Sequence, residues 1–162
     1  MVKIHKVQGD ISQEIASSFK GSIAIDTEAT GLQIPERDKL SLIQICGENS
    51  DVYVIQPDRK NYKAPNLVSV LENDKIQKIG HFLRFDKSAL EYFLKCKMKN
   101  IFCTKISSKI VRTYTDAHGL KNLVQEFCNK NLDKRQGSSD WNRDINDLSD
   151  KQLEYAANDV IY

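Results

Sequence analysis

The chain has 162 residues, of which 40% are hydrophobic and 28% are charged. This length and apolar content fit one globular domain with a single core, and they exclude two full domains and a wholly disordered chain. The 24 Lys and Arg residues against 22 Asp and Glu residues leave a formal net charge of +2, so total charge gives no argument for a nucleic-acid partner. The seven glycines and three prolines exclude a collagen-like or Pro/Gly-rich chain.

The apolar residues do not form any run near the roughly 18 residues of a membrane span. The first residues, from Met1 to Val7, lack the apolar stretch of a signal peptide. We therefore expect a cytoplasmic protein without membrane contact. The cysteines form no C-x-x-C pair and have no zinc-like spacing, which predicts reduced, structural thiols. They are Cys46, Cys96, Cys103 and Cys128.

The N-terminal third predicts one helix and three strands. Asp10, with Gln13 three residues later, has the form of a helix N-cap, and apolar residues then follow at helical spacing. The helix is expected over about 11–19. Three runs with the alternation and composition of strands follow, at 22–29, 40–47 and 51–56. Their short connections favour an antiparallel meander.

After residue 65 the pattern changes to alternating strands and helices, which favours parallel additions to the same sheet. The expected elements are a helix at 66–72, a strand at 76–80, a helix at 82–95, a strand at 101–104, and helices at 105–113 and 118–130. A long polar stretch covers 129–148, and loops of that length are more often functional or mobile than incidental. Ser149, with Gln152 three residues on, predicts a capped final helix from Asp150 to the chain end.

Charge is unevenly placed along the chain. Residues 84–112 hold eight Lys or Arg residues against two acids, a local charge of +6, and residues 140–159 carry a local charge of −4. Charge runs are usually solvated surface. The basic segment, including Lys105 and Lys109, is alternatively a track for a single-stranded nucleic acid.

Asp26 and Glu28 lie two residues apart in the predicted strand 22–29, so both carboxylates project from the same face. Like charges this close repel, and burying them is costly unless a cation or a shared proton compensates. Hard oxygen ligands suit Mg²⁺ or Mn²⁺. Alternatively, the strand is an edge whose acids face water.

Two further acids carry weaker signals. Asp86 stands among apolar residues directly after a predicted strand, where it is equally well explained as an acid favoured by the dipole of a following helix. Tyr155 and Asp159 are four residues apart on the final predicted helix, so their side chains share a face. The order of these features along the chain is more specific than any one of them.

Taken together, these residues match the three exonuclease motifs of the DEDD superfamily in its tyrosine-bearing subgroup, and the chain resembles the small stand-alone ribonuclease D-like proteins. The resemblance runs from about residue 20 to the end. Its segments are IDTEATGL at 25–32, GHFLRFD at 80–86, FCTKI at 102–106, RTYTDAHGL at 112–120, SSDW at 138–141 and YAANDV at 155–160. The resemblance implies an α/β, ribonuclease H-like fold. Its central mixed sheet would have five strands, three antiparallel strands followed by parallel additions, flanked by helices.

The resemblance also implies a catalytic site with two divalent metal ions, Mg²⁺ or Mn²⁺. Asp26, Glu28 and Asp159 would bind one ion, and Asp26 with Asp86 would hold the other. Tyr155 would orient the attacking water. A phenol with a pKa of about 10 is a poor base at neutral pH, so positioning is favoured over proton abstraction.

Substrate contacts are expected from residues around this site. The resemblance implies that the Thr27 backbone and Glu28 would contact the terminal sugar. Leu32 would wedge against the last bases, and Trp141 would stack on a base or, alternatively, anchor its loop on the core. His81 is interpreted as a hydrogen-bonded residue near the site rather than a metal ligand. Lys134 and Gln136 are expected to contact phosphates.

The function implied is that of a 3′-5′ exoribonuclease acting on single-stranded RNA 3′ ends in RNA processing or turnover. We expect residues 1–162 to form one exonuclease domain with a truncated final helix and no C-terminal helical nucleic-acid-binding domain. Two alternatives stay open: a non-catalytic nucleic-acid-binding or protein-binding domain of the same fold, and an exonuclease that acts on DNA, because the chemistry does not need the 2′-hydroxyl.

Overall fold

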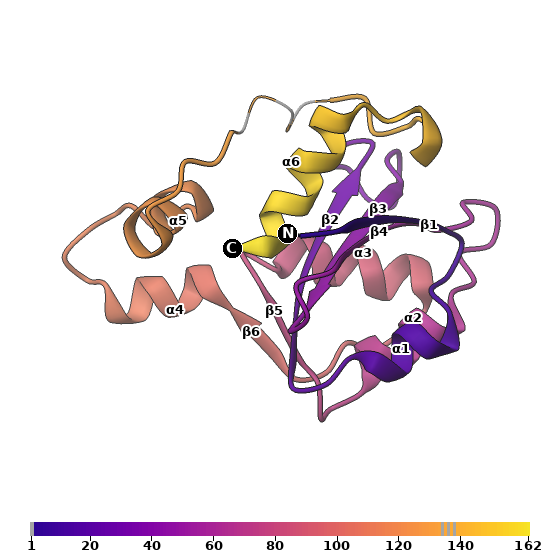
Figure 1. Ribbon diagram of the computed structural model, residues 1–162, viewed down its shortest axis with the longest axis horizontal. Coiled ribbons are helices and arrows are strands. Elements are labelled where there is room, and N and C mark those ends of the chain that lie inside the picture. The colour runs from indigo at the N-terminus through magenta and orange to yellow at the C-terminus, as the bar shows by residue number, and fades with distance from the viewer. Residues whose placement is uncertain (1, 134, 136, 138) are drawn as a thin grey trace.

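A computed structural model describes residues 2–133, 135, 137 and 139–162. Its centre is a mixed six-stranded sheet with the spatial order β1-β4-β3-β2-β5-β6 (Figure 1). The strands are β1 Ile4–Gln8, β2 Ser22–Ala29, β3 Leu40–Gly47, β4 Val52–Gln56, β5 Gln77–Gly80 and β6 Ile101–Cys103. The helices are α1 Gln13–Ser18, α2 Pro65–Glu72, α3 Arg84–Leu94, α4 Thr104–Val111, α5 Leu120–Cys128 and α6 Asp150–Ile161, with a 3₁₀ turn η1 at Ile145–Asp147.

The strand pairing confirms the predicted order of elements. β2, β3 and β4 are antiparallel neighbours, and β5 and β6 are added parallel to β2. The expected count of five strands was wrong, because β1 pairs parallel with β4, from Ile4 opposite Val52 to Gln8 opposite Gln56. β1 is an edge strand with no fully buried residue, so its sequence lacks an apolar run. The strand is therefore recognised by its backbone pairing with β4 and not by a pattern of buried side chains.

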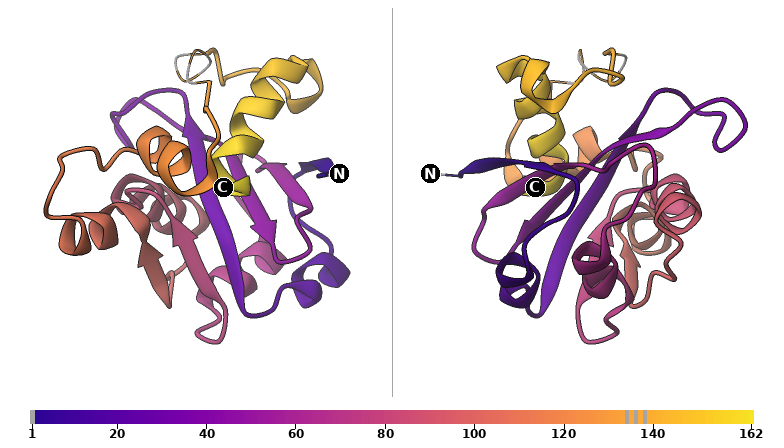
Figure 2. Two further views of the ribbon diagram at one scale, coloured as in Figure 1. Left: turned by 60° about the vertical axis from the view of Figure 1, so that its left-hand side comes forward. Right: turned by 90° about the vertical axis from the view of Figure 1, so that its right-hand side faces the viewer.

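The sheet separates two hydrophobic layers. β3 is buried along Leu40–Cys46, which is expected of a strand covered on both faces. One layer joins Ile23 and Ile25 of β2 to α1, α2 and α3. The other joins β3 and β4 to α6 and the segment before it, and Ala24 of β2 packs against it. Figure 2 shows α6 over one face of the sheet, with α2 and α3 beside the other. The alternation of β2 therefore directs Asp26 and Glu28 toward α6.

The first helix begins later than predicted. α1 starts at Gln13, and the hydroxyl of Ser12 accepts a hydrogen bond from the N–H of Ile15. Asp10, the expected N-cap, instead accepts from the backbone N–H groups of Asn66 and Leu67 at 2.8 and 2.9 Å. It therefore caps α2, where Ala64 offers no side-chain cap. A cap supplied from so far away in the chain leaves no local sequence pattern.

The buried Lys78 of β5 closes the other end of α2. Its ammonium group donates to the carbonyl oxygens of Asn73 and Ile76 at 2.6 and 2.7 Å, and to that of Val70 at 3.5 Å. The last carbonyls of a helix lack partners within the helix and carry partial negative charge, which suits a cation. Burial lowers the pKa of Lys78 to about 8.

We predict that Lys78→Met lowers the free energy of unfolding by about 1–3 kcal/mol, because buried carbonyls lose their donor. Lys75→Met is the matched control, since Lys75 lies three residues away with an exposed side chain. Urea unfolding of the two variants measures the difference. Equal stabilities would show that the Lys78 contacts contribute nothing net.

Candidate active site

Three carboxylates meet where β2 and α6 face each other. Asp26 and Glu28 come from β2, and Asp159 comes from the last turn of α6. One carboxylate oxygen of each lies within 4.8 Å of the others, and all three residues are half-buried. Segments more than 130 residues apart in the chain thus build one anionic site.

Local features of α6 place Asp159 in this position. The helix begins with the predicted capping box, in which Ser149 and Gln152 satisfy each other's backbone N–H groups. Ala156, Ala157 and Val160 are buried against the sheet, and the two alanines allow a close approach. Tyr155 and Asp159, four residues apart, then share the adjacent face.

Asp86 lies beside this group but outside it. It sits in the first turn of α3 with 6% of its surface exposed, and the hydroxyl of Thr27 donates to its Oδ1 at 2.6 Å. Burial raises the pKa of Asp86, and the charge of Asp159 adds to this effect, whereas the hydrogen bonds from Thr27 and from the Asp86 backbone oppose it. Thr27 therefore links Asp86 to the strand that carries Asp26 and Glu28.

Tyr155 is surrounded by negative charge. Burial is the main cause of its raised pKa, and Asp159, Glu28 and Asp26 raise the pKa further. The phenol therefore stays protonated at neutral pH and acts as a hydrogen-bond donor.

Trp141 is the neighbour of Tyr155 on the core side, with ring centroids 6.0 Å apart and an interplanar angle of 33°. Only 3% of Trp141 is exposed, and it belongs to the hydrophobic layer under α6. The expected stacking on a nucleobase is therefore wrong for this conformation, because the ring has no free face. The alternative interpretation, a loop anchor packed on the core, describes its position.

The other expected substrate contacts are placed differently. Leu32, just beyond β2, is 84% exposed and is available to contact a substrate. The Thr27 side chain is buried against Asp86, and the sugar contact expected from its backbone stays a prediction. His81 Nδ1 lies 3.0 Å from the Thr104 hydroxyl, which joins the ends of β5 and β6. Lys134 and Gln136 lie outside the described residues.

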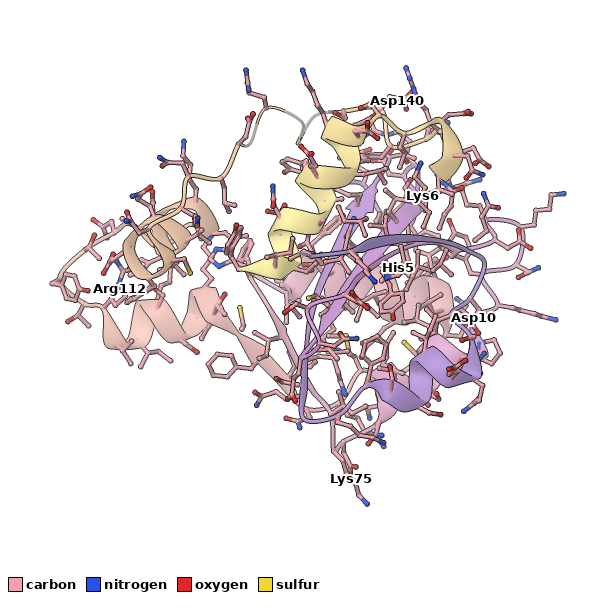
Figure 3. The ribbon with its side chains drawn as sticks, in the orientation of Figure 1. His5, Lys6, Asp10, Lys75, Arg112 and Asp140 are labelled. Atoms are coloured by element: carbon pink, nitrogen blue, oxygen red, sulfur yellow. The ribbon has the colours of Figure 1, made fainter. Side chains whose placement is uncertain are left out.

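The basic segment 84–112 is less cationic at its surface than its sequence indicates. Arg112 is only 5% exposed and lies between α4 and α5 (Figure 3), where it donates to Ser108, to the carbonyl of Ala117 and to Glu126. Lys87 is paired with Glu91 at 2.6 Å. These two cations therefore do not add free positive charge for a partner.

A hollow of about 340 Å³ beside Tyr155 was not predicted from the sequence. Its cationic lining residues, Arg135 and Lys151, are separated by sixteen positions, so no local motif marks it. The remaining lining residues are Asp133, Glu154 and Asn158. Their amide and charged groups suit a polar substrate next to the carboxylates.

Comparisons with known proteins match this fold. Residues 5–162 match the family model described as 3′-5′ exonuclease. The structure of Brucella melitensis NrnC bound to pGG is 41% identical with a TM-score of 0.90, covering 100% of this chain and 76% of that chain. The same protein with bound Mg²⁺ has a TM-score of 0.89 at 41% identity, covering 99% of this chain and 76% of that chain.

Two curated relatives are similar over most of this chain. DNA polymerase I of Aquifex aeolicus is 31% identical over 147 residues, which cover 85% of this chain and 21% of that protein. Ribonuclease D of Haemophilus influenzae is 32% identical over 145 residues, which cover 88% of this chain and 34% of that protein. The chain thus spans a fifth to two fifths of the curated relatives it matches.

The fold and the carboxylate cluster define the class, that of metal-dependent 3′-5′ exonucleases with a ribonuclease H-like fold. The chain belongs to the 3′-5′ exonuclease family. Among the described residues, no helix combines the length and apolar character needed to cross a membrane.

We predict that Asp26→Asn raises the free energy of unfolding of the metal-free protein by about 1 kcal/mol, because it relieves repulsion from Glu28 and Asp159. The same variant should lose the thermal stabilisation that Mn²⁺ gives the natural sequence. Thermal unfolding with chelator and with Mn²⁺ measures both effects. A variant that is less stable without metal would show that repulsion does not govern this cluster.

Thr27→Val is expected to lower the free energy of unfolding by about 1–3 kcal/mol, because the buried Asp86 carboxyl loses a hydroxyl donor. Thr27→Ser keeps the hydroxyl and should restore most of the loss. Urea unfolding of the pair checks the contribution. If valine and serine behaved alike, the 2.6 Å hydrogen bond would have no energetic role.

Proposed function

We propose that this chain removes nucleotides from the 3′ ends of single-stranded RNA by metal-dependent hydrolysis. The observation that carries the proposal is the meeting of Asp26, Glu28 and Asp159 within 4.8 Å. NrnC, which is 41% identical, was solved with the dinucleotide pGG, which supports short RNA 3′ ends as substrates. The similarity to ribonuclease D supports RNA as well.

The donor set fits hard divalent cations, because it offers carboxylate oxygens, which Mg²⁺ and Mn²⁺ prefer. Asp26, Glu28 and Asp159 would hold one ion, and Asp26 with Asp86 would hold a second. When bound, such ions supply positive charge that stabilises the scissile phosphate and the entering and leaving oxygens. The half-buried carboxylates of the chain supply the matching negative charge in fixed positions.

The neighbouring side chains would orient the reactants. The protonated Tyr155 hydroxyl would donate a hydrogen bond that positions the attacking water. Its raised pKa leaves almost no phenolate at neutral pH to accept a proton. Thr27 would keep Asp86 turned toward the site through the 2.6 Å hydrogen bond. Leu32 would contact the terminal bases. Lys151 would contact phosphate in the hollow beside Tyr155, where Arg135 is already paired with Asp133.

Action on DNA is the second candidate, because DNA polymerase I of Aquifex aeolicus is 31% identical over 85% of this chain. The metal-assisted chemistry does not require a 2′-hydroxyl, so a preference for RNA would have to come from contacts to the sugar.

The test is a degradation assay with 5′-labelled single-stranded RNA and DNA, and with pGG, in Mg²⁺, Mn²⁺ or chelator. We expect a descending ladder on RNA that requires metal and disappears with Asp26→Ala. A matching ladder on DNA alone would support the second candidate. Binding of either strand without hydrolysis in any metal would contradict both and support a non-catalytic domain.

Tyr155→Phe is expected to lower kcat about 100-fold, because the water loses its orienting donor. Since the Tyr155 pKa is raised, its ionisation should not reduce the wild-type rate between pH ~6 and ~9. The pH–rate profiles of the two proteins, with Mn²⁺ affinity as the control, make the comparison. A rate loss that follows phenol ionisation in this range would rule out the proposed protonated role.

A further inference from the structure

The ends of three parallel strands form a row that starts at the carboxylates. Ala24 of β2 pairs with Ile79 of β5, and Gly80 of β5 pairs with Cys103 of β6. His81 and Thr104, the residues that follow β5 and β6, are also neighbours, because their side chains are hydrogen-bonded. Phe82 follows His81 directly, and Lys105 follows Thr104 in the first turn of α4. Neighbouring strands are about 4.8 Å apart, so the end of β6, where α4 begins, lies about 10 Å across the sheet from β2.

Phe82 and Lys105 form an exposed cation–π pair at this edge. The Lys105 ammonium lies 4.0 Å from the centroid of the Phe82 ring, and 53% of Phe82 is exposed. Phe82 also has a φ of 62°, in the left-handed region that non-glycine residues rarely adopt. Core packing does not explain a strained aromatic residue that is half exposed. Such residues often persist for a function.

A hollow of about 260 Å³ lies next to the Phe82 ring. Leu83, Ile101 and Ile106 give it apolar walls. Arg84, in the first turn of α3, also lines it. Arg84 and Lys105 make no ion pair within the part of the chain that the structure describes. The edge thus offers an apolar surface with two cations that are not neutralised.

We propose that Phe82 and Lys105 bind a single strand upstream of its 3′ end, with a base on the aromatic surface and a phosphate on the ammonium. Single-strand binders combine aromatic surfaces with positive charge in this way. At about 3.4 Å per stacked nucleotide, the 10 Å separation corresponds to about three nucleotides. The pair therefore engages the third or fourth nucleotide from the 3′ end. This inference rests on the proposed function and extends it to substrates longer than a dinucleotide.

The far end of α3 provides a matched control. Tyr92 and Lys95, at the opposite end of α3, form a second exposed cation–π pair, with 4.2 Å between the ammonium and the ring centroid. That pair has the same chemistry but lies away from the strand ends. An unspecific attraction of aromatic residues and lysines for RNA would involve both pairs equally.

The experiment measures dissociation constants of RNA oligonucleotides of two to eight nucleotides by competition, with chelator and in an Asp26→Asn background that prevents hydrolysis. Phe82→Gly combined with Lys105→Ala removes the pair, and glycine accepts the positive φ, so folding is retained. We expect the affinity of the parent to rise beyond three nucleotides. The double variant should lose about tenfold in affinity for the octamer. Tyr92→Ala with Lys95→Ala should keep the affinity of the parent.

An unchanged length dependence in the Phe82 and Lys105 variant would overturn the inference, as would an equal loss in the Tyr92 and Lys95 control. Hydrolysis of pGG by the natural sequence is measured separately. If pGG and longer strands both resist hydrolysis in every metal, the proposed function fails, whereas the binding series still decides the role of Phe82 and Lys105.

Discussion

Mutual repulsion among Asp26, Glu28 and Asp159 is the constraint around which this fold is organised. Three negative charges within 4.8 Å oppose the docking of α6 on β2. Burial of Ala156, Ala157 and Val160 against the sheet, together with the capping box at Ser149, offsets that repulsion. Packing and capping thus hold α6 in a position where Asp159 is repelled by Asp26 and Glu28. A divalent cation bound between the three carboxylates would replace this repulsion by attraction.

The same constraint explains the arrangement of the surrounding side chains. Trp141 fills the layer under α6 and packs beside Tyr155, so the loop before α6 supports the phenol from the core side. On the other side, the Thr27 hydroxyl donates a hydrogen bond to the buried Asp86 carboxyl and holds it in place. The polar groups nearest the cluster are therefore held by residues that need not touch a substrate.

Sequence periodicity was sufficient for the features that depend on local geometry. The two-residue spacing of Asp26 and Glu28 predicts that they share a face of β2. The four-residue spacing of Tyr155 and Asp159 predicts that they share a face of α6. The resemblance to ribonuclease D-like proteins predicted that these two segments and Asp86 come together, which no local pattern indicates.

Features that depend on tertiary packing rather than on local periodicity were missed. Asp10 looks like a local cap but caps α2, and β1 is defined by its backbone pairing with β4. Lys78 looks like an ordinary strand lysine, yet it is buried on the carbonyls at the end of α2. Arg112 counts as positive charge in the sequence, but it is buried and paired with the exposed Glu126. For Asp10, β1 and Arg112 the partner lies too far along the chain for periodicity to show it, whereas Lys78 binds carbonyls only two to eight residues away, and its sequence does not show its burial.

The most direct test of the central claim is anomalous diffraction from crystals grown with Mn²⁺. We expect a strong peak within coordination distance of carboxylate oxygens from Asp26, Glu28 and Asp159, with α6 in the position described above. A peak at other residues, or a structure in which α6 has moved away from β2, would contradict the claim that these carboxylates form one cation site.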